Sequence, residues 1–318
     1  MAGKTKIEWA DRVWNPTVGC TPVSSGCTHC YAKRMFERFY QSHKFEDVTC
    51  RPERLTIPEK WIKPQRIFVD SMSDLFHEDV PDDFIDRVIV SCATRYTKHH
   101  VFMILTKRPE RMLKYFGGRY SNGGFDTREI IKGHLNIMDG KHPADPRIEF
   151  EWPLPNIWLG VSVEDQWTAN ERIPLLLQTP AAKRFVSVEP MLGTVDMRRV
   201  IYSMSPTDMR GTSLDGIDWV ICGGESGPGA RPLNPKWVRD LRDQCVAARV
   251  PFFFKQWGEW MPSSEMTEEE IKGLSKSIAK HLWPENPRGA RVMSFKVGKK
   301  KAGNLLDGQV WNEYPGGE

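Results

Sequence analysis

The chain has 318 residues, 40% of them hydrophobic, and a formal net charge of +4 because 45 Lys and Arg residues nearly match 41 Asp and Glu residues. This content suits one large α/β domain with insertions or two small domains, and it permits an anionic partner without requiring one. The seven irregularly spaced cysteines argue against a secreted disulfide framework, and no stretch approaches the roughly 18 continuous apolar residues of a membrane span. The N-terminus lacks the apolar run of a signal peptide, so we expect a cytoplasmic protein with reduced thiols.

Short apolar runs, each ending in polar residues, recur along the chain. We expect strands within residues 14–19, 66–74, 100–107, 156–164, 184–190, 218–225 and 251–256. Near-continuous apolar runs of this length are typical of parallel strands buried on both faces. Helical patterns separate several of them, at residues 82–97, 109–116, 168–177 and 234–248. The alternation predicts an α/β fold, a partial or complete parallel β/α (TIM-like) barrel with a loop insertion and a C-terminal appendage.

Two segments interrupt the alternation. A stretch at about residues 117–155 is rich in Gly, Asn, Asp, Lys and Pro, and we interpret it as an insertion in a barrel that covers residues 1–260. Residues 261–318 are predicted to form a C-terminal helix, at 267–281, and a tail that packs on the barrel. The tail contains three consecutive lysines, Lys299 to Lys301, which we interpret as a solvated segment rather than a binding patch.

Three cysteines, Cys20, Cys27 and Cys30, lie within eleven residues directly after the first apolar run. Thiolates this close in sequence can converge on one metal centre. A closed structural zinc site takes four ligands, so zinc would need a fourth one, such as His29 or Cys50. Three thiolates on a cubane iron–sulfur cluster leave one iron open to a cofactor or substrate. The spacing leaves both kinds of site open.

Polar residues follow the predicted strands where each strand ends. In a β/α barrel the chemistry lies at these C-terminal ends, so we expect the polar side chains and the cysteine loop to surround one mouth. Helix capping is the alternative explanation for the Ser and Asp residues, and a purely structural turn is the alternative for the glycines. The strand-end residues are Asp70, Ser71, Asp74, Thr106, Lys107, Ser162, Glu164, Asp165, Ser187, Glu189, Gly223, Gly224, Glu225, Lys255 and Gln256.

Six stretches, in order along nearly the whole chain, resemble the three-Cys-motif family of unknown function (DUF5131-type), which is often phage-encoded. They are residues 7–20, 30–32, 185–190, 223–228, 253–258 and 303–308. That family is in turn similar to the radical S-adenosylmethionine enzymes, including the spore photoproduct lyase branch. The two residues between Cys27 and Cys30, and Tyr31 after them, fit that superfamily, whereas the six residues between Cys20 and Cys27 exceed its usual three.

The resemblance implies roles for individual residues. Cys20, Cys27 and Cys30 would hold a [4Fe–4S] cluster, whose fourth iron would bind S-adenosylmethionine. Reductive cleavage of this cofactor would give a 5′-deoxyadenosyl radical, with Glu225 and Lys255 as the catalytic residues. The cofactor-binding residues would be Tyr31, Ser71, Asp74, Lys107, Ser162, Glu164, Glu189, Gly223 and Gly224.

We therefore expect a radical S-adenosylmethionine enzyme of unknown substrate. The relation to a DNA-repair branch and the slight positive charge favour a nucleic acid or nucleotide. The chemistry requires an electron donor, and members of the family are often accompanied by a dedicated partner protein. The alternative is a zinc- or cluster-stabilised nucleic-acid-binding protein without redox catalysis.

Overall fold

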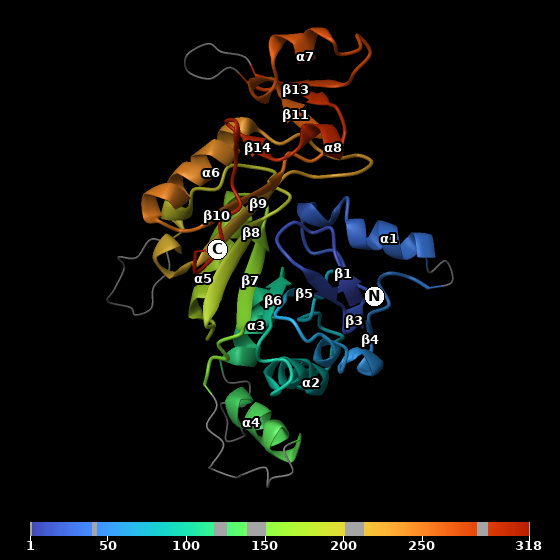
Figure 1. The fold of residues 1–318 in the computed structure, drawn as a ribbon, viewed down its shortest axis with the longest axis vertical. Helices are drawn as coiled ribbons and strands as arrows, with labels where there is room; N and C mark the ends of the chain where they lie inside the picture. Colours follow the sequence, from blue (N-terminus) through green and yellow to red (C-terminus); the bar gives the residue numbers. More distant parts are fainter. Residues whose placement is uncertain are drawn as a thin grey trace.

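The computed structural model describes residues 2–39, 43–117, 126–138, 151–200, 213–284 and 292–317, and its centre is a curved eight-stranded sheet (Figure 1). The strand order is β1-β2-β5-β6-β7-β8-β9-β10. β1 (Ala2–Lys4) runs antiparallel to β2 (Arg12–Trp14), and the other neighbours are parallel. β1 and β10 form the edges, so the predicted α/β barrel is confirmed in its partial form. Strands β5 to β10 are, in order, Arg66–Val69, Val101–Thr106, Ile157–Val163, Lys183–Val188, Trp219–Gly223 and Phe252–Gln256.

Alternate residues of these strands pack into two different cores, as expected for strands buried on both faces. One core lies between the sheet and the helices that follow the strands. Those helices are α2 (Asp82–Ala93), α3 (Pro109–Phe116), α5 (Gln166–Gln178) and α6 (Pro235–Ala248), and α4 (Thr127–Met138) packs on α2. The other core lies on the concave face and is mainly aromatic; it includes Trp9, Phe68, Trp158, Phe185, Trp219 and Phe253.

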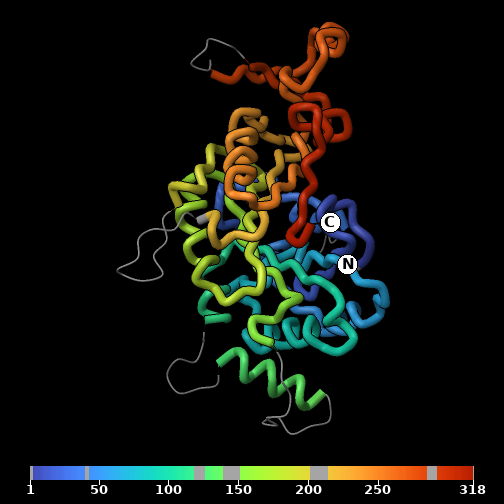
Figure 2. The backbone as a smooth tube through the Cα atoms, turned by 60° about the vertical axis from the view of Figure 1, so that its left-hand side comes forward, coloured from blue at the N-terminus to red at the C-terminus, as the bar shows by residue number. Residues whose placement is uncertain are grey.

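The C-terminal segment completes the concave core. Asn312 bridges to Phe253 of the edge strand β10, and the indole of Trp219 donates to the carbonyl of Glu313. The ring of Tyr314 packs on Trp219 with a centroid distance of 5.2 Å, and its hydroxyl donates to the carbonyl of Glu8. Figure 2 shows this segment running along the body of the molecule, and the Tyr314–Glu8 contact joins it to the residues before β2. The C-terminal segment therefore covers part of the aromatic core.

A three-stranded antiparallel sheet precedes that segment, in the order β11-β13-β12. The strands are Trp260–Pro262, Met293–Lys296 and Lys280–Leu282, respectively; α8 (Lys299–Ala302) and the β14–β15 hairpin (Leu305–Leu306 and Gln309–Val310) follow. The boundary between a barrel and an appendage at residue 260 stays a prediction. Of the predicted insertion at residues 117–155, the parts at 118–125 and 139–150 lie outside the described residues.

Two predicted elements are wrong in extent. The helix expected at 267–281 is only Glu268–Lys272 (α7), because none of its residues is buried and a long helix in water needs a packed apolar face. The first strand, expected at 14–19, is divided after Trp14, and Thr17–Val18 forms a separate pair (β3) with Thr49–Cys50 (β4). Pro16 has no amide to donate to the main sheet, and the amide of Thr17 is bound by the Asp70 carboxylate at 3.0 Å.

No helix among the described residues is both long enough and apolar enough to cross a membrane.

The aromatic core supplies a stability test at Gly160, in the middle of β7. A Cβ atom there would lie 2.5 Å from the ring of Phe185, which is held between Trp9 and Trp219. We expect Gly160→Ala to lower the free energy of unfolding by roughly 1–3 kcal/mol through overpacking. Gly3→Ala is the matched control, because nothing lies within 4 Å of its Cβ position. Urea unfolding checks this, and equal stability of the two variants would contradict the packing described.

Candidate active site

The cysteine loop begins at a backbone position that requires glycine. Gly19 has a φ of +101°, and a Cβ there would lie 2.7 Å from the carbonyl oxygen of Phe45. The chain then passes Cys20, Cys27 and Cys30 and enters α1 (Tyr31–Phe39). All three cysteines are half-buried free thiols. The loop thus presents three unpaired thiols between β3 and the first full helix.

Residues from four strand ends hold this loop over the C-terminal edge of the sheet. Arg108, after β6, donates to the sulfur of Cys20 at 3.5 Å and to Thr21. Glu164, after β7, accepts from Ser24 at 2.8 Å. Two further contacts join the Tyr31 hydroxyl to the carbonyl of Ser71, after β5, and His29 to Glu225, after β9. The predicted mouth and the cysteine loop therefore lie together.

Glu164 is the buried centre of this arrangement. Its side chain is fully buried, and its carboxylate lies 2.6 Å from the Lys107 ammonium and 3.2 Å from the Arg172 guanidinium. Burial raises the pKa of Glu164, but Lys107 and Arg172 more than offset that effect and hold the pKa below its ordinary value. Lys107 also donates to Ser162 at 2.8 Å. Three of the predicted cofactor-binding residues, Lys107, Ser162 and Glu164, thus form one network.

Glu189 and Lys255 form a second ion pair, at 2.7 Å, between the ends of β8 and β10. Both side chains are partly exposed, unlike Glu164. The carbonyl of Glu189 accepts from Ser162 at 3.2 Å, and the Glu189 carboxyl lies 3.3 Å from the position of a Cβ on Gly223. Glu189, Lys255 and Gly223 therefore lie beside Ser162 of the first network, as expected from their positions at the strand ends.

Glu225 is held by residues on both of its sides. Its carboxylate accepts from the backbone amide and the guanidinium of Arg231, at 2.7–2.9 Å, and lies 3.0 Å from His29. Burial raises the pKa of Glu225, but the hydrogen bonds from Arg231 and His29 overcome it and lower the pKa to about 2. Arg231 also donates to the carbonyl of Ser25. Glu225 therefore anchors the middle of the cysteine loop.

Two predicted site residues face other protein groups. The carboxylate of Asp74 accepts from Thr106, from the Lys107 amide and from Arg108, so Asp74 orients the guanidinium that contacts Cys20. A Cβ on Gly224 would lie 2.2 Å from the carbonyl oxygen of Trp257, and the Gly224 amide donates to Gln256. The missing side chain of Gly224 thus lets the backbone of the turn at Trp257 approach closely. Their predicted cofactor contacts stay predictions.

Sequence reasoning missed the arginines of this site. Arg108, Arg172 and Arg231 each bind a carboxylate of the mouth, and Ser24 and His29 bind two of the same carboxylates from the loop. Arg108 directly follows the strand-end residue Lys107. That position is the one feature of the sequence that could have identified Arg108 as a residue of the mouth. The other pairings join residues far apart in sequence or in a glycine-rich turn, so no spacing pattern could reveal them.

The three thiols of the loop are a donor set that an iron–sulfur cluster could use. Across the described ranges, no group of three or more His, Cys, Asp or Glu side chains is arranged to hold one ion. A cubane cluster binds each thiolate to a different iron, so its cysteines need not converge on one point. Burial, and secondarily Asp74, raise the pKa of Cys20 to about 12 against the effect of Arg108, so ligation would release its proton. Hydrogen bonds to sulfur, such as the one from Arg108, tune such clusters.

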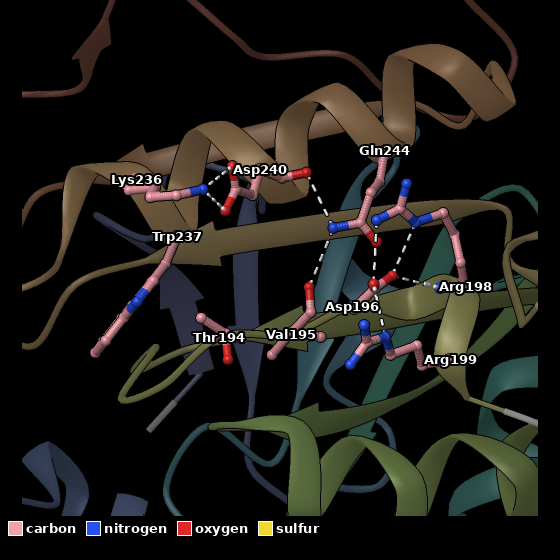
Figure 3. A pocket seen from close by; sticks show the side chains of 9 residues that line it. All are labelled: Thr194, Val195, Asp196, Arg198, Arg199, Lys236, Trp237, Asp240 and Gln244. Atoms are coloured by element: carbon pink, nitrogen blue, oxygen red, sulfur yellow. Dashed lines mark hydrogen bonds and ion pairs between the residues drawn. The ribbon is translucent and has the colours of Figure 1, made fainter. Parts of the chain in front are cut away.

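A separate hollow of about 470 Å³ lies between residues 194–199 and the first turns of α6 (Figure 3). Its charges are paired with one another. Asp196 binds Arg198 and Arg199, and Lys236 binds Asp240. Because these cations already have carboxylate partners, the hollow has little excess charge for an anionic ligand, and we assign the site to the mouth.

The Glu225 anchor predicts a dependence on acid. A carboxyl group with a lowered pKa stabilises the folded state above its ordinary pKa, near 4.5, and this contribution is lost as the pH falls towards about 2. We expect thermal unfolding of the unmodified protein to lose more stability between pH 5 and pH 3 than the Glu225→Gln variant does. Parallel curves for the two proteins would contradict the anchoring role.

The solved structures that resemble this chain are distant from it in sequence. No curated protein matches the sequence. Among solved structures, a spore photoproduct lyase variant with bound AdoMet and dinucleoside spore photoproduct covers 93% of this chain and 71% of its own, at 11% identity and a TM-score of 0.39. A spore photoproduct lyase complexed with dinucleoside spore photoproduct covers 95% and 72%, at 11% identity and a TM-score of 0.40. At this similarity we take no residue role from them.

One family matches nearly the whole chain. The match covers residues 4–315, and the family is described as "Protein of unknown function (DUF5131)". The chain belongs to the DUF5131 family.

Proposed function

We propose that this protein is a radical S-adenosylmethionine enzyme in which Cys20, Cys27 and Cys30 hold a [4Fe–4S] cluster. One observation carries the proposal: three free thiols lie on a single loop that is tied across the C-terminal strand ends of a partial barrel. Soft thiolate ligands select iron–sulfur centres, and three of them leave one iron for the cofactor. The sequence resemblance to radical S-adenosylmethionine enzymes supports the same assignment.

The bound cluster would supply the one electron that cleaves the sulfonium of S-adenosylmethionine to methionine and a 5′-deoxyadenosyl radical. The protein's own residues bind and orient the cofactor and exclude water. The methionine end of the cofactor carries an ammonium and a carboxylate, so its recognition requires both charges. Glu189 and Lys255 form the partly exposed pair at the mouth, and we assign them to these two groups. Glu164, whose side chain is fully buried, holds the loop through Ser24, and its partner Lys107 holds the neighbouring Ser162 in place.

We propose a nucleic acid or nucleotide as the substrate class. The support is the sequence resemblance to a DNA-repair branch of the superfamily and the net charge of +4. Glu225 is occupied by Arg231 and His29, so we place it as the anchor of the loop beside the reacting groups.

Metal analysis after anaerobic purification tests the cluster. We expect a brown protein with about four irons that absorbs near roughly 400 nm. Cys20→Ala, Cys27→Ala and Cys30→Ala should each lose most of the iron. Cys50→Ala is the matched control, since Cys50 is also a half-buried free thiol but lies in β4. A colourless protein with one zinc would contradict the cluster and favour the nucleic-acid-binding alternative.

The charged pair makes a separate prediction about cofactor affinity. Glu189→Gln and Lys255→Met should each weaken S-adenosylmethionine binding by roughly tenfold to a hundredfold, because each removes a hydrogen bond between charged groups. The iron content should not change, since neither residue contacts the cysteine loop among the interactions described. Lys236→Met, at the exposed pair with Asp240, is the control. Unchanged affinity, measured by equilibrium dialysis, would remove this pair from the binding site.

A further inference from the structure

Helix α1 exposes an apolar stripe immediately after the cysteine loop. Ala32 and Phe36 anchor the helix in a small core with Val18, Phe45 and Met72. Beside that buried side, Tyr31, Met35 and Phe39 recur every four residues and are 46%, 40% and 59% exposed. Residues four apart are neighbours on a helix surface, so these three side chains form one strip. Contiguous exposed apolar surface of this kind marks an interaction site more often than isolated apolar residues do.

Two arginines border the stripe, also four residues apart. Among the described residues neither Arg34 nor Arg38 has an ion pair with a carboxylate. The Arg34 guanidinium donates to the carbonyls of Ser226 and Pro228, and Arg38 lies over the ring of Phe39. Lys33, around the helix, is by contrast paired with Glu46 at 2.7 Å. We call Tyr31, Arg34, Met35, Arg38 and Phe39 the α1 face; it is apolar at its centre and positively charged along one edge.

The composition of the α1 face favours a protein partner over a nucleic acid. Tyr, Phe, Met and Arg are the residue types enriched in the cores of protein–protein interfaces. A nucleic-acid surface needs a row of cations that neutralises several phosphates, and this face offers two. Its uncompensated positive edge complements a partner with an acidic surface.

The position of the α1 face identifies what such a partner would do. The face begins at Tyr31, the residue after Cys30, and Cys27 and Cys30 are themselves partly exposed. We propose that the α1 face docks an acidic electron-transfer protein that reduces the cluster, an inference that rests on the proposed function. In the docked complex one electron leaves the donor, which is oxidised by one electron, and the cluster is reduced by one; no atom is transferred.

Substitutions on this face that avoid the site provide the test. Arg34 holds the glycine-rich loop and Tyr31 contacts Ser71, so the informative variants are Met35→Asp and Arg38→Glu. Reduction of the cluster-loaded protein would be followed by stopped-flow absorbance, with a reduced acidic flavodoxin or with dithionite as the electron source. At low salt we expect each variant to slow reduction by flavodoxin about tenfold and to leave reduction by dithionite unchanged. Binding of flavodoxin to the oxidised protein should weaken in parallel.

Two matched controls lie elsewhere on the surface. Arg95 is exposed and lies over the ring of Tyr96 much as Arg38 lies over Phe39, so Arg95→Glu repeats the charge change. Ile62 is 90% exposed, so Ile62→Asp repeats the loss of an exposed apolar group. Neither control should slow reduction by flavodoxin.

Three results would overturn the docking proposal while leaving the enzyme proposal intact. The α1 variants could react with flavodoxin as fast as the controls do. Reduction by dithionite could slow as much as reduction by flavodoxin does, which would mean that the face has a structural role. They could instead weaken binding of a single-stranded oligonucleotide without affecting flavodoxin, which would make the face a nucleic-acid surface. An unmodified protein that holds no cluster would overturn both proposals.

Discussion

The mouth of this protein depends on one buried carboxylate, that of Glu164. Removing such a charge from water costs several kcal/mol unless partners compensate for it, and here Lys107, Arg172 and Ser24 do so. Ser24 belongs to the cysteine loop, so the same interaction fixes the loop on the sheet. Gly26 is the corresponding adaptation in the loop, because a Cβ there would lie 2.5 Å from the Glu164 carboxylate. The close fit of loop and strand end therefore follows from burying and pairing this charge.

The two ends of the concave face have different chemistry. Within the strands, this face is filled by the aromatic core and covered by the C-terminal segment at Tyr314. The C-terminal ends of the strands carry the charged pairs of Glu164, Glu189 and Glu225. An aromatic core next to charged pairs of opposite sign suits a zwitterionic cofactor. The charged pairs can bind its ammonium and carboxylate, and the aromatic side chains do not compete for these groups.

The sequence predicted the parallel sheet and the polar rim because both are local patterns. Apolar runs that end in Glu, Lys or Ser show where each strand ends, and topology then brings those ends together. It could not predict the partners of these groups, as with Glu225 and Arg231, because they depend on tertiary geometry and loop conformation. The antiparallel strand β1 carries no apolar pattern, and the helix expected at 267–281 lacked a surface on which to pack. Pro16 was a usable signal for the break in the first strand.

The central claim is that three cysteines leave one iron of a cluster open to S-adenosylmethionine. Electron paramagnetic resonance of the anaerobically reduced protein, with and without S-adenosylmethionine, tests it most directly. The account predicts the signal of a reduced [4Fe–4S] cluster whose g-values shift when the cofactor is added, since the cofactor becomes a ligand of the open iron. A cluster signal that S-adenosylmethionine leaves unchanged, or the absence of any iron–sulfur signal, would contradict it.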